Sequence, residues 1–380
     1  MQMTEKEQIQ LLADLVAIRS VNGKETEVAE YIKSFLKKYG IEAKILPIAE
    51  GRSNLVAEVG SGEPVYGWSG HMDVVDAGDE KQWSVPPFEL TEKSGKLYGR
   101  GITDMKSGVA AMLIAMVEIK ERQLLKRGTI RLMLTTGEEN GQAGSQAMYE
   151  GGYMEDVDSL LIPEPFNTGI VYAHKGSLNL KITSRGQAAH SSMPDLGFNA
   201  IKPLIRVIDK AQNYFDQTSL ENELLGKPLL NFTLISGGNQ INSLPEYAEA
   251  ECNGRTIPEL DNEKMTEILK DLIAKENETG AKLTLEVETS LPAVFTNGKA
   301  KLLTQLSRLG KKYYHQDIQP QGASGVTDAA NLLKDKDETF RFAVFGCGEV
   351  SLAHQIDEYC VKDKYLAFPK LLIDLATEEA

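Results

Sequence analysis

Histidine and carboxylate residues occur in four short segments, each directly after a run of residues that is typical of a buried strand. In the first segment, residues 69–75, His71 and Asp73 are two positions apart. Alternate residues of an extended chain point to the same side, so Asp73 could accept the second imidazole N–H of His71. Such a pair fixes the tautomer of a metal-binding histidine and raises its basicity. The alternative is a surface histidine beside an aspartate.

Two further segments place carboxylates next to glycine residues. Asp104 lies within residues 98–108, just before a run that predicts a buried helix. It could give one oxygen to each of two cations, or it could only cap that helix. Glu138 and Glu139 follow the predicted strand at 129–136. Neighbouring side chains point in different directions, so one can bind a metal while the other acts as a general base. A solvated acidic turn is the alternative.

The fourth segment holds Glu164 between Pro163 and Pro165, after the apolar residues 160–162. The prolines would stiffen the loop and hold the carboxylate, unless the segment is a rigid exposed turn. A late histidine, His354, follows another predicted strand. The set offers nitrogen and oxygen ligands of the kind that zinc accepts. Two-metal hydrolytic sites use such ligands, with a bridging solvent molecule as the nucleophile.

Motifs for other kinds of catalysis are absent or incomplete. The chain has no G-x-x-x-x-G-K followed by Ser or Thr, and no H-E-x-x-H. Residues 67–71 miss the G-x-S-x-G pattern by one position. Gly99 and Gly101 begin like a dinucleotide-binding loop, but the third glycine is missing. The sequence therefore favours metal-assisted chemistry.

Composition limits the class of protein. The 380 residues carry 41 basic and 55 acidic side chains, a net charge of −14, which makes the chain a poor general binder of nucleic acid or anionic membranes. With 42% hydrophobic and 25% charged residues, it is neither a disordered chain, a collagen nor a disulfide mini-protein. The three cysteines lack C-x-x-C spacing, the N-terminus lacks a signal-peptide pattern, and the longest apolar run, 109–117, is too short for a membrane helix. We expect a cytoplasmic protein.

The candidate residues must be positioned by an α/β fold, because predicted strands and helices alternate at both ends of the chain. Between residues 176 and 291 the predicted order is strand, helix, strand, strand, helix, strand, which is typical of a small split-βαβ sandwich. We therefore predict a discontinuous catalytic domain, residues 1–175 with 292–380, and an inserted domain, residues 176–291.

In this order, the four segments and His354 resemble the motifs of the dinuclear zinc deacylases and peptidases. This family includes succinyl-diaminopimelate desuccinylase, acetylornithine deacetylase, aminoacylase and a glutamate carboxypeptidase. The resemblance covers nearly the whole chain. It implies a zinc-exopeptidase-type domain with a doubly wound mixed sheet, an inserted α+β lid that often forms a homodimer, and two Zn²⁺ ions, for which Co²⁺ can substitute.

The resemblance also implies roles for single residues. The implied metal ligands are His71 and Glu164 for one zinc, Glu139 and His354 for the other, and Asp104 as the bridge between them. Asp73 would orient His71. Glu138 would take the proton of the bridging water and return it to the leaving amine.

Further residues match positions that contact the substrate in this family. His190 resembles a histidine that reaches the active site of the other subunit and supports the oxyanion, and Asn242 would also act there. Arg255 matches a position that binds a substrate carboxylate. Gly325 and Thr327 resemble the substrate loop, although that segment could equally be a helix N-terminus.

The resemblance implies a metal-dependent amidohydrolase that removes an acyl group from an amino acid. We expect N-succinyl-LL-diaminopimelate to be the substrate, giving succinate and LL-diaminopimelate for lysine synthesis. An acetylornithine deacetylase, a dipeptidase or a carboxypeptidase would use the same metal ligands, and a non-catalytic scaffold with the same fold is a remote alternative. The chain departs from some desuccinylases at Lys175, where they have an Arg-rich turn, and His174 and His315 match no family role.

Overall fold

A computed structural model describes residues 2–379 of the chain, with side chains as far as residue 378. The chain divides into two compact units. The first comprises the chain as far as Tyr172, then Thr296–Gln321 and the part from Thr327 onward; the second comprises Ala173–Phe295 and Gly322–Val326. Residues 1 and 380, the ends of the predicted catalytic domain, lie outside the described residues. The predicted boundaries placed residues 173–175, 292–295 and 322–326 in the catalytic domain, whereas the structure groups them with the second unit.

The main sheet is mixed, with strand order β1-β2-β6-β3-β7-β15-β8-β13 and with β14 also paired to β8. Its strands are β1 (Ala43–Ala49), β2 (Arg52–Ser61), β3 (Val65–His71), β6 (Gly128–Thr135), β7 (Val157–Ile162), β8 (Gly169–His174), β13 (Val294–Phe295), β14 (Gln319–Ala323) and β15 (Arg341–Val344). The central strands β6, β3, β7 and β15 are parallel to one another. Strands of a parallel sheet are covered on both faces, and every residue of β3 is buried.

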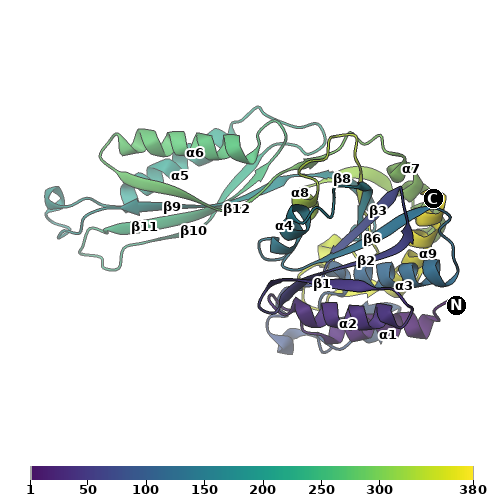
Figure 1. Cartoon of the computed structure of the whole chain (residues 1–380). Helices are drawn as coiled ribbons and strands as arrows, with labels where there is room; N and C mark the ends of the chain where they lie inside the picture. Colours follow the sequence, from purple (N-terminus) through teal and green to yellow (C-terminus); the bar gives the residue numbers. More distant parts are fainter. Residues whose placement is uncertain (1, 380) are drawn as a thin grey trace. The chain divides into compact units, whose positions relative to one another are not determined.

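Helices cover both faces of this sheet, with α1, α2, α3 and α9 on one face and α4 and α8 on the other (Figure 1). The helices of the first unit are α1 (Glu5–Ala17), α2 (Glu25–Lys37), α3 (Ser107–Glu121), α4 (Ala143–Glu150), α7 (Lys301–Tyr314), α8 (Ala329–Leu332) and α9 (Lys362–Glu379). Helix α3 is apolar around its circumference and packs against both the sheet and α9, which explains why its residues are almost all buried.

Local signals in the sequence account for several of these elements. Thr4 caps α1, and its side chain and that of Glu7 form the reciprocal hydrogen bonds of the predicted capping box. A small second sheet in the first unit, formed by β4 (Thr91–Lys93), β5 (Lys96–Tyr98) and β16 (Tyr359–Val361), was not predicted. It joins segments far apart in the chain, so no local pattern announces it.

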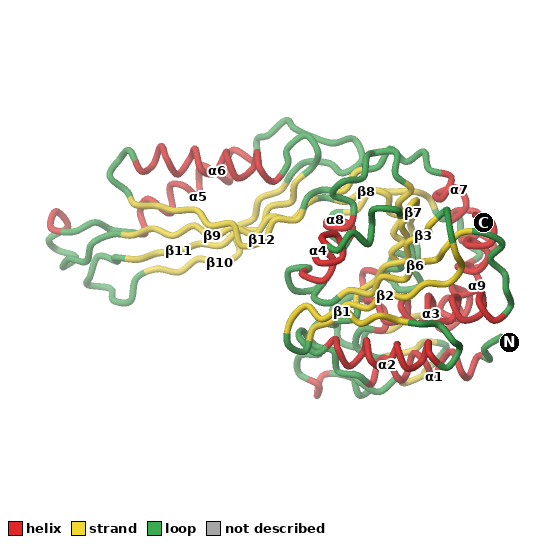
Figure 2. Tube along the Cα trace, in the orientation of Figure 1, coloured by secondary structure: helices red, strands yellow, loops and turns green. Residues whose placement is uncertain are grey.

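The second unit contains a four-stranded antiparallel sheet of order β10-β11-β9-β12. Its elements are β9 (Gly176–Arg185), α5 (Ile201–Asp216), β10 (Leu229–Gly237), β11 (Tyr247–Thr256), α6 (Asn262–Asn277) and β12 (Lys282–Leu291). Figure 2 shows both helices on one face of these strands, and the other face is open within this unit. Apolar residues of the covered face and of the helices, among them Ile182, Leu283 and Leu204 of α5, form the core. The predicted split-βαβ order is therefore present.

No helix within residues 2–379 is both long enough and apolar enough to span a membrane.

Candidate metal centre

Four neighbouring parallel strands end at the same edge of the main sheet, and each is followed by a predicted metal ligand or base. His71 is the last residue of β3, and Glu139 follows the end of β6 by a short loop. Glu164 comes two residues after β7, and His354 lies in the loop after β15. Ligands of open α/β sheets bind at this carboxyl edge. The topology therefore brings together residues that are up to 283 positions apart in the sequence, since His71 and His354 meet here.

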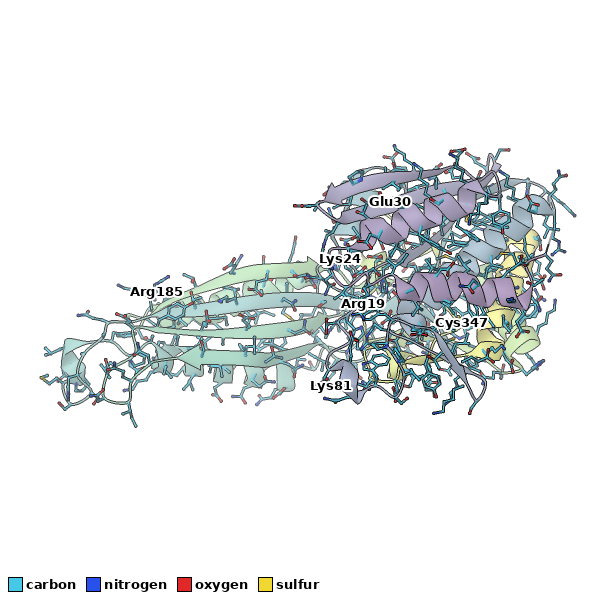
Figure 3. All side chains as sticks on the ribbon, turned by 90° about the horizontal axis from the view of Figure 1, so that it is seen from below. Arg19, Lys24, Glu30, Lys81, Arg185 and Cys347 are labelled. Atoms are coloured by element: carbon cyan, nitrogen blue, oxygen red, sulfur yellow. The ribbon has the colours of Figure 1, made fainter. Side chains whose placement is uncertain are left out.

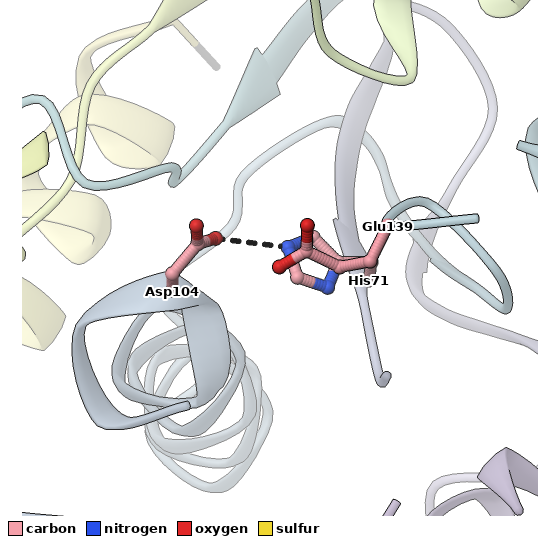
Figure 4. Close-up of side chains that lie close together, drawn as sticks. All are labelled: His71, Asp104 and Glu139. Carbon is pink, nitrogen blue, oxygen red and sulfur yellow. Dashed lines mark hydrogen bonds and ion pairs between the residues drawn. The ribbon is translucent and has the colours of Figure 1, made fainter. Parts of the chain in front are cut away.

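Asp104 stands between the two histidines. Its Oδ1 lies 3.0 Å from His71 Nε2, and its Oδ2 lies 3.5 Å from His354 Nε2. Figure 4 shows Asp104 and Glu139 directed toward the imidazole of His71. Ligand atoms of these three residues all lie within 4.8 Å of one another. One carboxylate that faces a different histidine with each oxygen has the arrangement that a bridge between two cations requires.

The remaining ligands complete one pair on each side of Asp104. Glu164 Oε1 lies 3.8 Å from His71 Nε2, and Glu139 Oε1 lies 2.9 Å from His354 Nε2. The structure thus pairs His71 with Glu164 and His354 with Glu139, which is the grouping implied by the family resemblance. Asp104 does not cap α3, because the N-cap position is Lys106 and no side chain caps that helix.

The backbone carbonyl of Asp73, rather than its carboxylate, orients the ring of His71. His71 Nδ1 lies 2.9 Å from this carbonyl, and the carboxylate oxygen lies 3.7 Å away. Because a carbonyl only accepts hydrogen bonds, Nδ1 carries the hydrogen and Nε2 is directed at Asp104. The expected contact through the Asp73 side chain is different in the structure because β3 ends at His71, and the alternation of an extended strand stops there.

The Asp73 carboxylate instead holds the loop after β6. Its two oxygens accept the backbone N–H groups of Glu138 at 3.2 Å and of Glu139 at 3.0 Å. Asp73 is completely buried. The loop that carries the predicted base and one predicted ligand is therefore fixed by the loop that carries another ligand.

Glu138 and Glu139 turn to different partners, as their adjacency predicts. Glu139 faces His354, while Glu138 Oε1 accepts a hydrogen bond from Gln142 Nε2 at 2.8 Å. Gln142 is buried and has a left-handed backbone with φ of 56°. Gln142 belongs to no motif that was recognised in the sequence. A glutamine four residues after a glutamate is the only local signal that could have indicated it.

Glu164 is buried, so the exposed-turn alternative does not apply. Close backbone packing holds its loop. A Cβ atom at Gly108 would lie 2.3 Å from the carbonyl oxygen of Pro163, and one at Gly346 would lie 2.3 Å from that of Glu164. Both positions therefore require glycine, and the loop between Pro163 and Pro165 is held from two sides.

The electrostatics of the cluster fit bound cations. Desolvation raises the pKa of Glu164 well above its ordinary value, and the charge of Asp104 adds to this effect. Burial by itself would lower the pKa of His71, but the nearby carboxylates, Glu164 foremost, raise it well above its usual range. These directions show an excess of negative charge that lacks compensation. The donor atoms are the nitrogen and oxygen types that divalent metals such as zinc accept, so the residues present fit a metal site.

Thr327 and Gly325, expected to contact the substrate, fall in different units. Thr327 is buried in the first unit, and its Oγ1 accepts the N–H of Ala329 at 3.3 Å, next to the start of α8. This contact matches the helix N-terminus alternative for the segment. Gly325 is exposed, within the segment 322–326 of the second unit.

His190 and Asn242 lie at one end of the second unit. His190 forms a backbone bridge with Ser243, and the carbonyl of Asn242 accepts the N–H of Ser191 at 3.0 Å. Both side chains are exposed. This end lies beyond the first residue of β11, Tyr247, which pairs with Arg185 (Figure 3).

Arg255 lies toward the other end of the same sheet. It pairs with Ser177 of β9, eight residues along β11 from Tyr247, which is about 27 Å in an extended strand. The structure therefore brings His190 and Asn242 together, but it separates Arg255 from both of them within one chain.

Arg255 and Lys175 form a cationic pair. Lys175 is only 4% exposed, and its Nζ donates to the main-chain carbonyl of Lys227 at 2.6 Å. Burial and the charge of Arg255 lower the pKa of Lys175, and burial lowers the pKa of Arg255. Among residues 2–378, no acidic side chain pairs with either of them. Lys175 is buried and Arg255 is half-buried, and charges withdrawn from water without an acidic partner are costly, so this pair is suited to an anionic ligand.

The fold and the metal cluster define a class of protein. Residues 67–378 match the model of peptidase family M20/M25/M40, and the chain belongs to this family. The predicted family and fold class are thereby confirmed, and the chain is a hydrolase. A probable succinyl-diaminopimelate desuccinylase of Staphylococcus epidermidis is 42% identical to this chain. The match has a length of 390 residues and covers 96% of this chain and 96% of the relative.

Solved structures of the family share the fold. An M20 family metallo-carboxypeptidase of Sulfolobus solfataricus has a TM-score of 0.83 at 19% identity and covers 98% of both chains. A dinuclear metal binding peptidase of the M20 family from Bacillus subtilis has a TM-score of 0.73 at 18% identity, with 99% of this chain and 98% of the other covered.

Proposed function

We propose that this chain is a dinuclear zinc-dependent deacylase that hydrolyses N-succinyl-LL-diaminopimelate to succinate and LL-diaminopimelate. The observation that carries the proposal is the position of Asp104, which faces His71 with one oxygen and His354 with the other. The name of the Staphylococcus epidermidis relative supports the choice of substrate. The pathway served would be lysine synthesis in the cytoplasm, and three free cysteines fit that reducing compartment.

Two divalent cations bound by these residues would polarise the amide carbonyl and acidify a water molecule. His71 and Glu164 would hold one cation, Glu139 and His354 the other, and Asp104 both. Zinc suits the donor set, and cobalt could replace it.

Glu138 is the general base of the proposed reaction. Gln142 donates a hydrogen bond to one of its carboxylate oxygens. The other oxygen is left to accept a proton and then to donate it to the leaving amine. Desolvation raises the pKa of Glu138 well above its ordinary value, which favours this exchange of the proton. The backbone contacts from Asp73 keep the base in place while the proton moves.

The second unit supplies recognition of the carboxylates of the substrate. N-succinyl-LL-diaminopimelate carries several carboxylates, and Lys175 with Arg255 offers two cations that no acidic side chain of residues 2–378 neutralises. An arginine can hold both oxygens of one carboxylate. This pair explains how a chain of net charge −14 would attract an anionic substrate.

A homodimer completes the proposed enzyme. His190 and Asn242 lie beyond Tyr247, which is itself about 27 Å from Arg255 along β11, so one chain cannot easily present all three to the same small substrate. A second copy would supply His190 and Asn242, and His190 would support the oxyanion.

A panel of substrates tests the function. Protein loaded with zinc is assayed by kcat/KM on N-succinyl-LL-diaminopimelate, N-acetylornithine, several N-acetyl amino acids and a few dipeptides. We expect a preference of about 100-fold for the succinyl substrate, equivalent to about 2.7 kcal/mol of transition-state discrimination. A preference for acetyl substrates or dipeptides would keep the metal chemistry and reject this substrate. No hydrolysis with both metals bound would indicate a scaffold instead.

A further inference from the structure

One buried carboxylate next to the candidate metal ligands has no part in the proposed chemistry. Glu358 is 1% exposed and lies four residues after His354, just before β16. Its Oε2 accepts hydrogen bonds from Arg100 Nη1 at 2.6 Å and from the N–H of Gly101 at 3.0 Å. Its Oε1 accepts the N–H groups of Thr103 at 2.7 Å and of Asp104 at 3.2 Å.

These contacts hold together the backbone of the loop that carries Asp104. The loop follows Gly101, which has a left-handed backbone, and Asp104 has the non-helical angles φ −127° and ψ 93°. Its N–H groups therefore have no regular helical partners, and a buried N–H without an acceptor is costly. A single carboxylate accepts three of these groups at once. Removing it would release the segment that aims Asp104 between the two histidines.

The same residue connects this loop to the loop of His354. The main-chain carbonyl of Glu358 accepts the N–H of Gly99 at 3.1 Å. Arg100 donates to the side chain of Glu358 and also to the carbonyl of Gln355 at 3.2 Å, one residue after His354. Glu358 thus ties the backbone of one predicted metal ligand to the backbone of another.

We infer that Glu358 is a positioning residue for the metal centre, which sets the distance between Asp104 and His354 through the backbone of both loops. The inference rests on the metal-binding part of the proposed function and is independent of the substrate. Glu358 itself makes no contact with a reacting atom. The effect would be on how tightly a cation is held by Asp104 and His354.

A purely structural role for the buried pair of Arg100 and Glu358 predicts something else. Breaking a buried ion pair leaves one charge without a partner and destabilises the whole domain. Such a loss lowers the melting temperature but leaves the metal site of the folded fraction unchanged. Metal affinity and the absorption spectrum of bound cobalt distinguish the positioning role from the purely structural one. A loss of global stability changes neither quantity in the folded protein.

The test compares Glu358→Gln with Glu118→Gln, a matched control. Glu118 is also buried in the first unit, near the end of α3 that lies away from Asp104, and it accepts the N–H of Met3 and a bond from Arg122. Zinc affinity is measured by competition with a chelator, and the coordination of Co²⁺ by visible absorption. We expect Glu358→Gln to weaken the binding of one of two metal equivalents by about 10–100-fold and to change the cobalt spectrum. Glu118→Gln should lower the melting temperature and leave both readouts unchanged.

Unchanged metal affinity and an unchanged cobalt spectrum in Glu358→Gln would overturn the inference, however much stability is lost. Should that variant fail to fold, Arg100→Lys keeps the carboxylate with its three backbone contacts and removes the guanidinium link to Gln355. It should weaken metal binding measurably, though by less than about 10-fold, and an affinity equal to that of the unmodified chain would overturn the inference. The metal titration uses no substrate, so failure of the desuccinylase assay leaves it intact. An unmodified chain that binds no divalent metal would reject both proposals.

Discussion

The buried carboxylate of Asp73 accepts the backbone N–H of Glu139 at 3.0 Å. A residue in the loop after one strand thereby fixes a candidate metal ligand in the loop after the neighbouring strand. Asp73 also holds the ring of His71 through its carbonyl. Two of the candidate ligands, together with the base next to one of them, depend on this single residue.

Asp73→Asn should therefore reduce metal binding more than it reduces the stability of the fold. An amide can accept one of the two backbone N–H groups, but its own NH₂ would face the other, so the loop of Glu138 and Glu139 must shift. We expect metal affinity and kcat each to fall by about 10–100-fold. The control is Asp76→Asn, an exposed neighbour that accepts the N–H of Gly78. Equal behaviour of the two variants in a metal titration would contradict the positioning role of Asp73.

Glu138→Gln should separate metal binding from turnover. The side chain keeps its size and its contact with Gln142, but it can no longer accept a proton. We expect the variant to retain its metal, measured by elemental analysis, while kcat falls by about 10³-fold. Gln142→Ala should lower kcat much less, because it removes the hydrogen bond to Glu138 and leaves the base itself in place. Near-normal turnover in Glu138→Gln would reject the assignment of the base.

Lys175→Met and Arg255→Met should impair binding of substrates with several carboxylates. A hydrogen bond to a charged group contributes about 1.5–3 kcal/mol, so each substitution should raise KM by about 10–100-fold. Lys181→Met is the matched control, because Lys181 lies on the same sheet and is already paired with Glu249 at 2.7 Å. The measurement is KM for the succinyl substrate against KM for a neutral N-acetyl amide. An equal rise for both substrates would argue against carboxylate recognition.

Stability should depend on pH through His174. This side chain is fully buried, and burial lowers its pKa from 6.5 to about 4. The unfolded chain therefore binds the proton more readily, and the stabilisation is present above pH 6.5 and lost as the pH falls toward 4. A difference of this size corresponds to about 3 kcal/mol. Denaturant unfolding at several pH values should show a steeper loss for the unmodified chain than for His174→Gln. Parallel curves would show that His174 is not the group responsible.

Mixing two inactive variants tests whether active sites are shared between subunits. A His190→Ala chain lacks the residue proposed to act in the partner, and a Glu138→Ala chain lacks the base. A mixed dimer would contain one site with both residues intact, so activity should recover toward about one quarter of that of the unmodified protein if chains exchange at random. Absence of recovery, with subunit exchange confirmed by mass spectrometry, would reject the shared site.

The candidate metal ligands could be named from the sequence because their motifs, in this order, resemble those of the family. Local patterns showed that His71, Glu139 and Glu164 follow apolar runs, but they left a structural alternative open for each of these segments. The capping box of α1 and the element order of the second unit are local in the same sense. These features depend on periodicity and on neighbours within a few residues, which a sequence displays directly.

The supports of the cluster were decided only by the tertiary structure. Glu358 reaches residues 254 to 258 positions earlier in the chain, and the Asp73 carboxylate reaches 66 positions forward to Glu139. A buried carboxylate chooses its partners from whatever N–H groups the packed loops bring within reach, and no spacing in the sequence encodes that choice. Strand order made the ligands neighbours, and the packing of loops over the strand ends determined which side chains hold them.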